Sequence, residues 1–432
     1  MVLAMLAAFG AMAQEPALRF GFLTDTHINA DGSNLDRVQK ALTLFKTNGV
    51  DLVVHGGDLC SAFYPVGYVA YSNCFETVFA GAEPVPRKIY AVGNHDTQDN
   101  LLGGTNQITA AAEALRILGA ENLHTDKRTV NGYTFLVMPY ALGDTGQGFL
   151  SWEEYESAVS NACEEAGAGM PVFVLEHKPP QDTVYNTASI WGYQQSKQIL
   201  SKYPQVVELS GHVHGSLRND VFFWQGAFSV VNACCLQQWF GLLDGQSDTT
   251  AKDSNGVLLV DVFADKIVIA RWDVLDGTEI DPEHRWQINL PHAEATAAFN
   301  RTNLVAAEQA NPPAFGEGAE LAVAAVTSGS DTTGYKLTFP QVATNAMTYW
   351  IEVQRQIGGS WTPVAHSEIF SDYWKAPSER SATATYTFPT GELDVNTTYR
   401  FAVQPVGQYG AKGAAITAEV TTPSTLITPD FF

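Results

Sequence analysis

The chain has 432 residues, of which 45% are hydrophobic and 16% are charged, and its formal net charge is −22. This balance is typical of well-buried globular domains, and the length allows more than one of them. The acidic excess argues against a broad nucleic-acid-binding surface, because such surfaces are built from clustered Lys and Arg. Bound divalent cations can still reverse the field locally and attract a small phosphate ester.

The first residues indicate export. An apolar run ends at Ala11-Met12-Ala13, a pattern typical of a signal-peptide cleavage site. We therefore expect residues 1–14 to be a signal peptide and the mature protein to be secreted, periplasmic or on the cell surface. The segment lacks a basic n-region, and a short buried strand or helix is the alternative. No later apolar run is long enough to form a transmembrane segment.

From Leu18 the chain repeats a short apolar strand, a polar turn and a segment of helical periodicity, which predicts an α/β core. Helices are expected after the first strand, with Asn34 as a candidate N-cap, and near 110–118 and 152–166. Two hairpins, 221–231 and 256–272, are expected to extend a sheet. The expected strands of the repeat are 18–23, 51–55, 88–92, 134–138, 171–176 and 206–210.

The pattern changes near Pro291, where an Ala-rich stretch leads into Asn311-Pro312-Pro313. Beyond about residue 319, alternating strands replace the helical signal, which predicts a small all-β sandwich. The expected organisation is a signal peptide at 1–14, a catalytic domain at 15–290, a linker at 291–318, a sandwich at 319–423 and a C-terminal tail at 424–432.

Polar blocks follow five of the expected strands. In α/β sheets, ligand sites collect in the crevice beyond the carboxyl ends of the strands, so these blocks are expected to converge. Each block alone is weak evidence, because an Asp-x-His after a strand is more often a turn with a solvated His. Together they predict one metal site. The blocks are Asp25-Thr26-His27, Gly57-Asp58, Gly93-Asn94-His95-Asp96, Glu176-His177 and Gly211-His212-Val213-His214.

These blocks resemble those of the calcineurin-like metallophosphoesterase superfamily, and the resemblance covers about residues 18–287. It implies a two-sheet β-sandwich flanked by helices, with two metal ions at the strand ends. By that similarity, Asp58 bridges the two metals. The resemblance assigns Asp25, His27 and His214 to one metal, and Asn94, His177 and His212 to the other.

The chemistry of these residue types agrees with that resemblance. Carboxylate and imidazole ligands without thiolate suit two divalent or trivalent ions of Mn, Fe or Zn. A bridging carboxylate helps to hold two cations roughly 3.5–4 Å apart, as an in-line displacement requires. Water bound to such metals loses a proton near neutral pH. We therefore expect a small phosphate ester to be hydrolysed by a metal-bridging hydroxide.

His95 lies outside the family's ligand set. We expect it to protonate the leaving alkoxide or to stabilise the transferring phosphoryl oxygens. Asp96 either orients His95 or caps a turn or helix. His55 is expected to be structural. The loop after His177 carries Trp191, which is either an aromatic face for a base or sugar or a packing anchor.

The C-terminal segment resembles a fibronectin type III domain. Trp350 lies on an early expected strand, and Leu393 precedes Tyr399 where that family places its tyrosine corner. Nothing in this segment resembles a catalytic site. A non-catalytic surface-binding or scaffolding role through the sandwich, with contact to a cell surface, is the alternative function, and a missing metal ligand would favour it.

Two departures from the pattern of purple acid phosphatases narrow the choice of subgroup within the family. Purple acid phosphatases carry a metal-binding Tyr where this chain has Ser61, and Gly where it has His27. The sequence is more similar to the family's phosphodiesterases, including the class III cyclic-nucleotide phosphodiesterases. Whether the substrate is a phosphodiester or a phosphomonoester stays open. A nuclease is disfavoured by the acidic charge.

Overall fold

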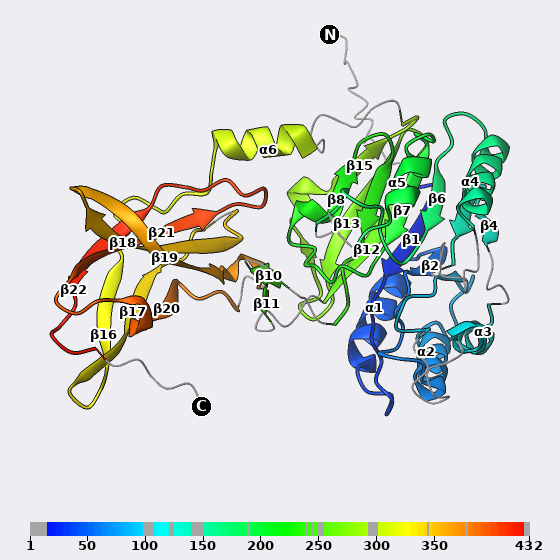
Figure 1. Ribbon diagram of the computed structural model, residues 1–432. Helices are drawn as coiled ribbons and strands as arrows, with labels where there is room; N and C mark the ends of the chain where they lie inside the picture. The colour runs from blue at the N-terminus through cyan, green and yellow to red at the C-terminus, as the bar shows by residue number, and fades with distance from the viewer. Residues whose placement is uncertain are drawn as a thin grey trace, which may run out of the picture.

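The chain folds into a larger body with two facing sheets and a smaller all-β body, as the computed structural model shows (Figure 1). The expected signal peptide lies outside the described residues. No described helix is both long and apolar enough to cross a bilayer. The described residues are 15–97, 107–120, 125–139, 151–185, 187, 191–237, 241–243, 246–248, 255–292, 301–343, 345–375 and 379–426.

The first sheet of the larger body has seven strands in the order β14-β13-β12-β1-β2-β3, with β15 paired to β13. Strands β1, β2 and β3 are parallel neighbours, and β12 joins β1 antiparallel. The expected hairpin at 256–272 is the pair β12–β13. The strands are β1 (Leu18–Leu23), β2 (Leu52–His55), β3 (Arg87–Tyr90), β12 (Gly256–Val262), β13 (Lys266–Asp273), β14 (Thr278–Ile280) and β15 (Trp286–Asn289).

The second sheet has six strands in the order β4-β5-β6-β7-β9-β8. Its middle strands, β5, β6, β7 and β9, are parallel, and the expected hairpin at 221–231 is the antiparallel pair β8–β9. A separate short hairpin joins β10 (Gly241–Leu243) to β11 (Gln246–Asp248). The strands of the second sheet are β4 (Asp126–Val130), β5 (Tyr133–Val137), β6 (Val172–Leu175), β7 (Val206–Ser210), β8 (Phe223–Gln225) and β9 (Ser229–Asn232).

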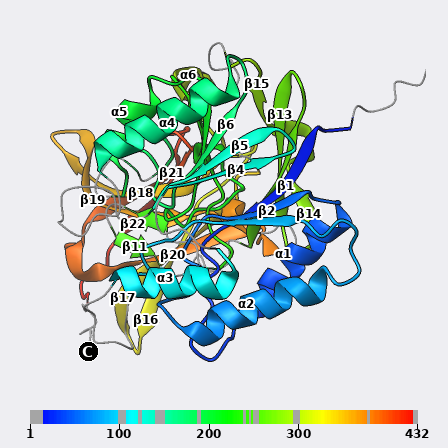
Figure 2. The ribbon, with the colours of Figure 1, turned by 90° about the vertical axis from the view of Figure 1, so that its right-hand side faces the viewer.

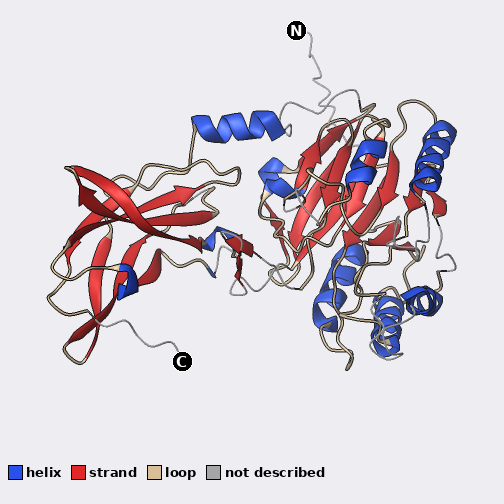
Figure 3. Cartoon of the chain, in the orientation of Figure 1, coloured by secondary structure: helices blue, strands red, loops and turns tan. Residues whose placement is uncertain are grey.

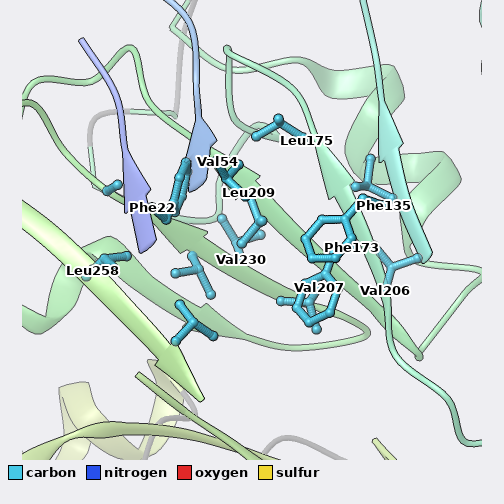
Figure 4. Close-up of a cluster of buried hydrophobic side chains, with 14 of the residues drawn as sticks. Phe22, Val54, Phe135, Phe173, Leu175, Val206, Val207, Leu209, Val230 and Leu258 are labelled. Atoms are coloured by element: carbon cyan, nitrogen blue, oxygen red, sulfur yellow. The ribbon is translucent and has the colours of Figure 1, made fainter. Parts of the chain in front are cut away.

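Side chains of both sheets share one hydrophobic core (Figure 4). Phe20 of the first sheet meets Phe135 and Phe173 of the second edge to face, with ring centroids 5.5 and 5.3 Å apart. All three rings are fully buried. Burying apolar surface contributes about 25 cal/mol per Å², so this interface is a main source of stability for the larger body.

Helices cover the outer faces of both sheets (Figure 2). Helix α4 begins with a capping box, in which Ser151 and Glu154 satisfy each other's backbone N–H groups. The larger body is therefore the expected two-sheet β-sandwich flanked by helices. The helices are α1 (Leu35–Thr47), α2 (Pro65–Val78), α3 (Gln107–Leu118), α4 (Trp152–Ala166) and α5 (Gln194–Leu200).

Asn34 does not cap α1 in the expected way. Its backbone is left-handed, with φ of 76°, and its side chain makes no capping hydrogen bond. Instead, the Asn34 amide donates to the carbonyl oxygen of His27 at 3.3 Å. The side chain is thus directed to the turn after β1 rather than to the first turn of the helix.

The smaller body is a sandwich of a three-stranded and a four-stranded sheet, in the orders β16-β17-β20 and β19-β18-β21-β22 (Figure 3). All strand pairs in it are antiparallel. This is the expected all-β fold. Its strands are β16 (Ala322–Ser328), β17 (Asp331–Pro340), β18 (Thr348–Ile357), β19 (Ser360–Phe370), β20 (Thr383–Pro389), β21 (Thr398–Val406) and β22 (Ile416–Thr421).

Tyr399 and Trp350, the two residues of the C-terminal segment compared with a fibronectin type III domain, differ in their placement. The Tyr399 hydroxyl accepts a hydrogen bond from the Asp394 backbone N–H at 2.8 Å, which is the geometry of a tyrosine corner. Trp350, in contrast, lies outside the core cluster of the sandwich. Its ring stacks on His366 with centroids 4.5 Å apart, and Lys412 Nζ lies 3.6 Å from its centroid. Trp350 faces away because Tyr349 and Ile351, its neighbours along the strand, point into the core.

Part of the expected linker is helical and connects the two bodies. Helix α6 (Arg301–Ala310) forms in the Ala-rich stretch, where helix propensity is high. At one end Arg301 donates to the Thr183 carbonyl oxygen at 2.9 Å, and at the other the Glu308 carboxylate accepts from the Tyr409 backbone N–H at 2.8 Å. Met347 of the sandwich belongs to the core cluster of the larger body, so the two bodies share apolar contacts.

Two buried carboxyl groups lie side by side in the second sheet. Burial raises the pKa of Glu176 to about 8, although Ser196 and Tyr155 donate to it. Burial and the neighbouring Glu176 also raise the pKa of Glu208 well above its usual value. The Glu208 Oε2 atom accepts from Ser210, and no donor in the described part of the chain reaches Oε1. Folding therefore favours the protonated acids.

We expect Glu208→Gln to flatten the pH dependence of stability. Because the folded pKa of these acids lies above the unfolded value, their contribution to stability is full below about pH 4.5 and is lost as the pH rises through the folded pKa. At pH 9 the variant should be more stable than wild type by roughly 1–3 kcal/mol, the usual cost of an incompletely bonded buried polar group. Urea unfolding at pH 5 and pH 9 measures this, and parallel declines of both proteins would contradict it.

Candidate metal centre

The seven residues expected as metal ligands meet at one edge of the larger body. The structure brings them together because strands β1, β2 and β3 of one sheet, and β6 and β7 of the other, end at this edge. The residues that follow these strands are Asp25 and His27 after β1, Asp58 after β2, Asn94 after β3, His177 after β6, and His212 and His214 after β7.

The ligand atoms form two groups that share one carboxylate. In each group the atoms lie within 4.8 Å of one another, and Asp58 belongs to both. A shared carboxylate suits a pair of cations held roughly 3.5–4 Å apart. The first group is Asp25, His27, Asp58 and His214, and the second is Asp58, His177 and His212.

In the first group, three ligand atoms face one small space. Asp25 Oδ2 accepts from the Thr24 hydroxyl at 2.6 Å and from the His212 backbone N–H at 3.0 Å. Asp25 Oδ1 is buried and lies 3.0 Å from His214 Nε2. His27 Nε2 also lies 3.0 Å from His214 Nε2. A cation between these atoms would satisfy all three.

In the second group, hydrogen bonds orient the ligand atoms. His177 Nδ1 lies 2.8 Å from the Gly56 carbonyl oxygen, to which it donates. Its Nε2 atom is therefore directed to Asp58 Oδ2 and to Asn94 Oδ1, each 3.2 Å away. His212 Nδ1 lies 3.0 Å from the same Asn94 oxygen. A backbone carbonyl that fixes the ring of a histidine is typical of metal-binding imidazoles.

The pKa shifts of the cluster residues indicate that the site favours positive charge. Although burial opposes it, His177 and His214 hold the pKa of Asp25 well below its usual range. Burial lowers the pKa of His177, but Asp58 and Asp25 outweigh it and raise the value to about 9. Burial and the charge of His177 lower the pKa of His212 to about 3. Two buried carboxylates thus attract positive charge, which fits a pair of metal cations.

Five of the seven residues adopt a left-handed backbone conformation. The φ angles are 50° at Asp25, 42° at His27, 51° at Asp58, 70° at His212 and 42° at His214. Such a conformation costs a non-glycine residue roughly 1–2 kcal/mol, and strain of this kind clusters at functional sites. Bonds between the turns hold it in place, including Asp25 N–H to the Gly57 carbonyl oxygen at 3.0 Å.

Glycines let the turns approach closely. A Cβ atom on Gly93 would lie 2.1 Å from Asp58 Oδ1, and one on Gly211 would lie 2.2 Å from Asp25 Oδ2. No side chain fits at either position without moving a carboxylate. The glycines of the Gly-Asn-His-Asp and Gly-His-Val-His blocks therefore set the positions of ligands on other strands.

His95 lies at the mouth of the cluster. Its Nδ1 atom lies 2.8 Å from the Ser61 carbonyl oxygen, and its backbone N–H donates to Asp58 Oδ1 at 2.8 Å. The Nε2 atom faces the cavity and lies 4.0 Å from Asp58 Oδ2. The side chain is 34% exposed. His95 can therefore reach a ligand that sits over Asp58.

Asp96 does not orient His95. Its Oδ1 atom accepts from the Tyr68 hydroxyl at 2.6 Å and from the Leu59 N–H at 3.0 Å, and Oδ2 accepts from the Gly93 N–H at 2.9 Å. Both oxygens are thus engaged by the loops after β2 and β3. The geometry favours the turn-capping role, and the Ser61 carbonyl orients His95 instead.

His55 is fully buried and is not a member of either ligand group. Its Nδ1 atom accepts from the Gly57 N–H at 3.2 Å, and its Nε2 atom lies 3.1 Å from the Thr26 hydroxyl oxygen, which donates to the Leu59 carbonyl. Burial lowers its pKa to about 3, so the ring is neutral. His55 ties together the turns that carry Asp25 and Asp58.

A cavity of about 460 Å³ opens over the cluster. Three of its lining residues, Asn29, Asn34 and Gln237, were not expected from the sequence, since isolated amides in loops carry no periodic or motif signal. Trp191 lines it as well. The full lining consists of His27, Asn29, Asn34, Asp58, Ser61, Asn94, His95, Trp191, His212, His214 and Gln237.

The profile of the calcineurin-like phosphoesterase family matches residues 18–216. A search of curated proteins found no match. Among solved structures, the chain is similar to a dimetal phosphatase from Danio rerio at 12% identity, over 62% of this chain and 99% of that chain, with a TM-score of 0.36. The C-terminal part is similar to a fibronectin type III domain of human collagen XX at 21% identity, over 24% of this chain and 86% of that chain, with a TM-score of 0.16.

We expect Asp96→Asn to lower the free energy of unfolding by roughly 1–3 kcal/mol, because its amide would face N–H and O–H donors with a donor of its own. Tyr68→Phe, which removes one of these bonds, should cost about 1 kcal/mol. Denaturant unfolding measures both. If Asp96→Asn left stability unchanged and altered only activity, the anchoring role would be wrong.

Proposed function

Because residues 18–216 match the model of the calcineurin-like phosphoesterase family, we propose that the protein hydrolyses a phosphate ester at a dinuclear metal centre. The observation that carries the proposal is the pair of ligand groups joined by Asp58. The alternative, a non-catalytic binding role, would be favoured by a missing ligand. All seven expected side chains are present and converge.

The proposed metals are two ions of Mn, Fe or Zn, bound as the family resemblance implies. Asp58 would be shared by the two ions, Asp25, His27 and His214 would hold one of them, and Asn94, His177 and His212 would hold the other. The carboxylate, imidazole and amide donors suit these metals. When bound, the ions supply a hydroxide nucleophile and polarise the phosphoryl oxygens.

A residue of the chain, His95, then supplies a proton to the leaving group. His95 donates through Nδ1 to the Ser61 carbonyl, which keeps Nε2 directed into the cavity. When the ring is protonated, Nε2–H can pass its proton to the departing alkoxide. The backbone N–H of His95 meanwhile holds Asp58 Oδ1 in place at 2.8 Å. Removal of the His95 side chain leaves this backbone bond intact.

We also propose that the protein is exported. The support is the apolar N-terminal run that ends at Ala11-Met12-Ala13. Detection of the protein outside the cytoplasm, with a mature N-terminus near residue 15, would test this.

We expect purified protein with added Mn to hydrolyse p-nitrophenyl phosphate or its bis-ester, and a chelator to abolish the activity. Asp58→Asn should lower kcat/KM by at least roughly 100-fold, the upper range for loss of a group that merely supports a metal ligand. Metal analysis should show reduced metal content in the variant. Equal rates in wild type and variant would exclude catalysis at this site.

We expect His95→Gln to lower kcat by roughly 10²–10⁴-fold for an alkyl phosphate, whose alkoxide needs a proton to leave. The loss should be much smaller for a p-nitrophenyl ester, because nitrophenolate departs without one. The metal content should match that of wild type. An equal loss for both leaving groups would contradict the proposed proton transfer.

A further inference from the structure

An exposed tryptophan stands beside the ligand cluster. Trp191 lies in the loop between β6 and α5, and its ring centroid is 5.0 Å from that of His212, with the planes tilted by 45°. Its side chain lines the cavity and is 40% exposed. No other Trp, Tyr or Phe side chain whose exposure the structure describes is exposed. An indole kept open to solvent at this position offers a stacking surface.

Gln237, from the segment after β9, lines the same cavity and carries a donor without a partner among the described residues. Its Nε2 atom is buried, and no acceptor among the described residues reaches it. A buried donor without a partner costs roughly 1–3 kcal/mol, so an acceptor on a bound ligand would stabilise this group. The backbone of Gln237 is fixed, because its carbonyl accepts from Arg37 at 2.7 Å. The amides of Asn29 and Asn34 line the cavity as well.

The charges around the cavity limit what can bind beyond the metal ligands. None of the described lining residues is Lys or Arg. Lys178, in the same loop as Trp191, has its Nζ atom 4.6 Å from the centroid of the Tyr193 ring and does not line the cavity. A second phosphate on the substrate would therefore find no cationic side chain among these residues. An uncharged group suits this wall better.

Resting on the phosphoesterase activity proposed above, we propose that Trp191 and Gln237 form a subsite for a flat, uncharged heteroaromatic ring. The substrate class is then an ester with a single phosphate on a nucleoside-like group. The ring stacks on the indole, and the Gln237 amide donates to an acceptor on the ring edge. A cavity of about 460 Å³ is within the range of small-molecule sites.

The test compares esters that undergo the same reaction and differ in whether they carry a nucleoside. The diester pair is p-nitrophenyl thymidine 5′-phosphate and methyl p-nitrophenyl phosphate, and the monoester pair is thymidine monophosphate and glycerol phosphate. Wild type should prefer the nucleoside member of the pair that it hydrolyses. Trp191→Ala should reduce this preference, as a ratio of kcat/KM, by roughly 5- to 150-fold. Trp191→Phe should keep most of it.

Trp361→Ala is the matched control, because Trp361 lies on the C-terminal sandwich beneath the Arg400 guanidinium. It should leave the preference unchanged. A wild-type preference for glucose 6-phosphate over thymidine monophosphate, or a preference unaffected by Trp191→Ala, would overturn the subsite. Thymidine diphosphate that bound more tightly than the monophosphate would overturn the single-phosphate part.

A binding measurement separates this inference from the proposed activity. Thymidine alone, followed by calorimetry, should bind wild type and bind Trp191→Ala and Gln237→Leu at least about fivefold more weakly. If no ester is hydrolysed but thymidine binds in this manner, the proposed activity fails and the subsite stands. If esters are hydrolysed and thymidine binds all three proteins equally or not at all, the subsite is wrong and the activity stands.

Discussion

The burial of two carboxylates between two sheets is the constraint on which the rest of the structure depends. Asp25 and Asp58 are 0% and 1% exposed, and both lie where strands of facing sheets end. Removing two negative charges from water is costly unless positive charge lies close by. Four histidines surround them, and the two carboxylates raise the pKa of His177 to about 9. The same demand for positive charge makes the site fit for cations.

Backbone geometry meets this demand at the expense of local strain. Left-handed conformations at five ligand residues cost several kcal/mol together, on the order of 1–2 for each. The strain persists because the turns are bonded to one another, through Asp96, His55 and the backbone of Gly57. These residues bind no metal in our proposal, yet they determine where the ligands stand. The two sheets must pack before the centre exists, since each supplies part of it.

The sequence predicted the part of the site that follows from strand topology. Ligands at successive strand ends could be foreseen, because parallel strands bring their carboxyl ends to one edge. The direction in which the side chain of a turn residue points could not be predicted from the sequence. Asp96 follows His95 directly, yet its carboxylate turns away from that ring and accepts from the Tyr68 hydroxyl of α2 and from two backbone N–H groups. Asn34 likewise donates to the turn after β1. Helix α6 takes the place of part of the expected linker, and contacts at both of its ends hold it against the two bodies.

The shared contacts between the two bodies also decide how the protein can be divided. The Met347 side chain of the sandwich belongs to the core of the larger body, and its sulfur accepts from the Asn219 amide at 2.8 Å. A shortened version that stopped before the sandwich would leave an apolar socket and an amide without its acceptor. The change in sequence pattern near Pro291 is therefore a poor site for truncation, because the larger body and the sandwich depend on each other's side chains.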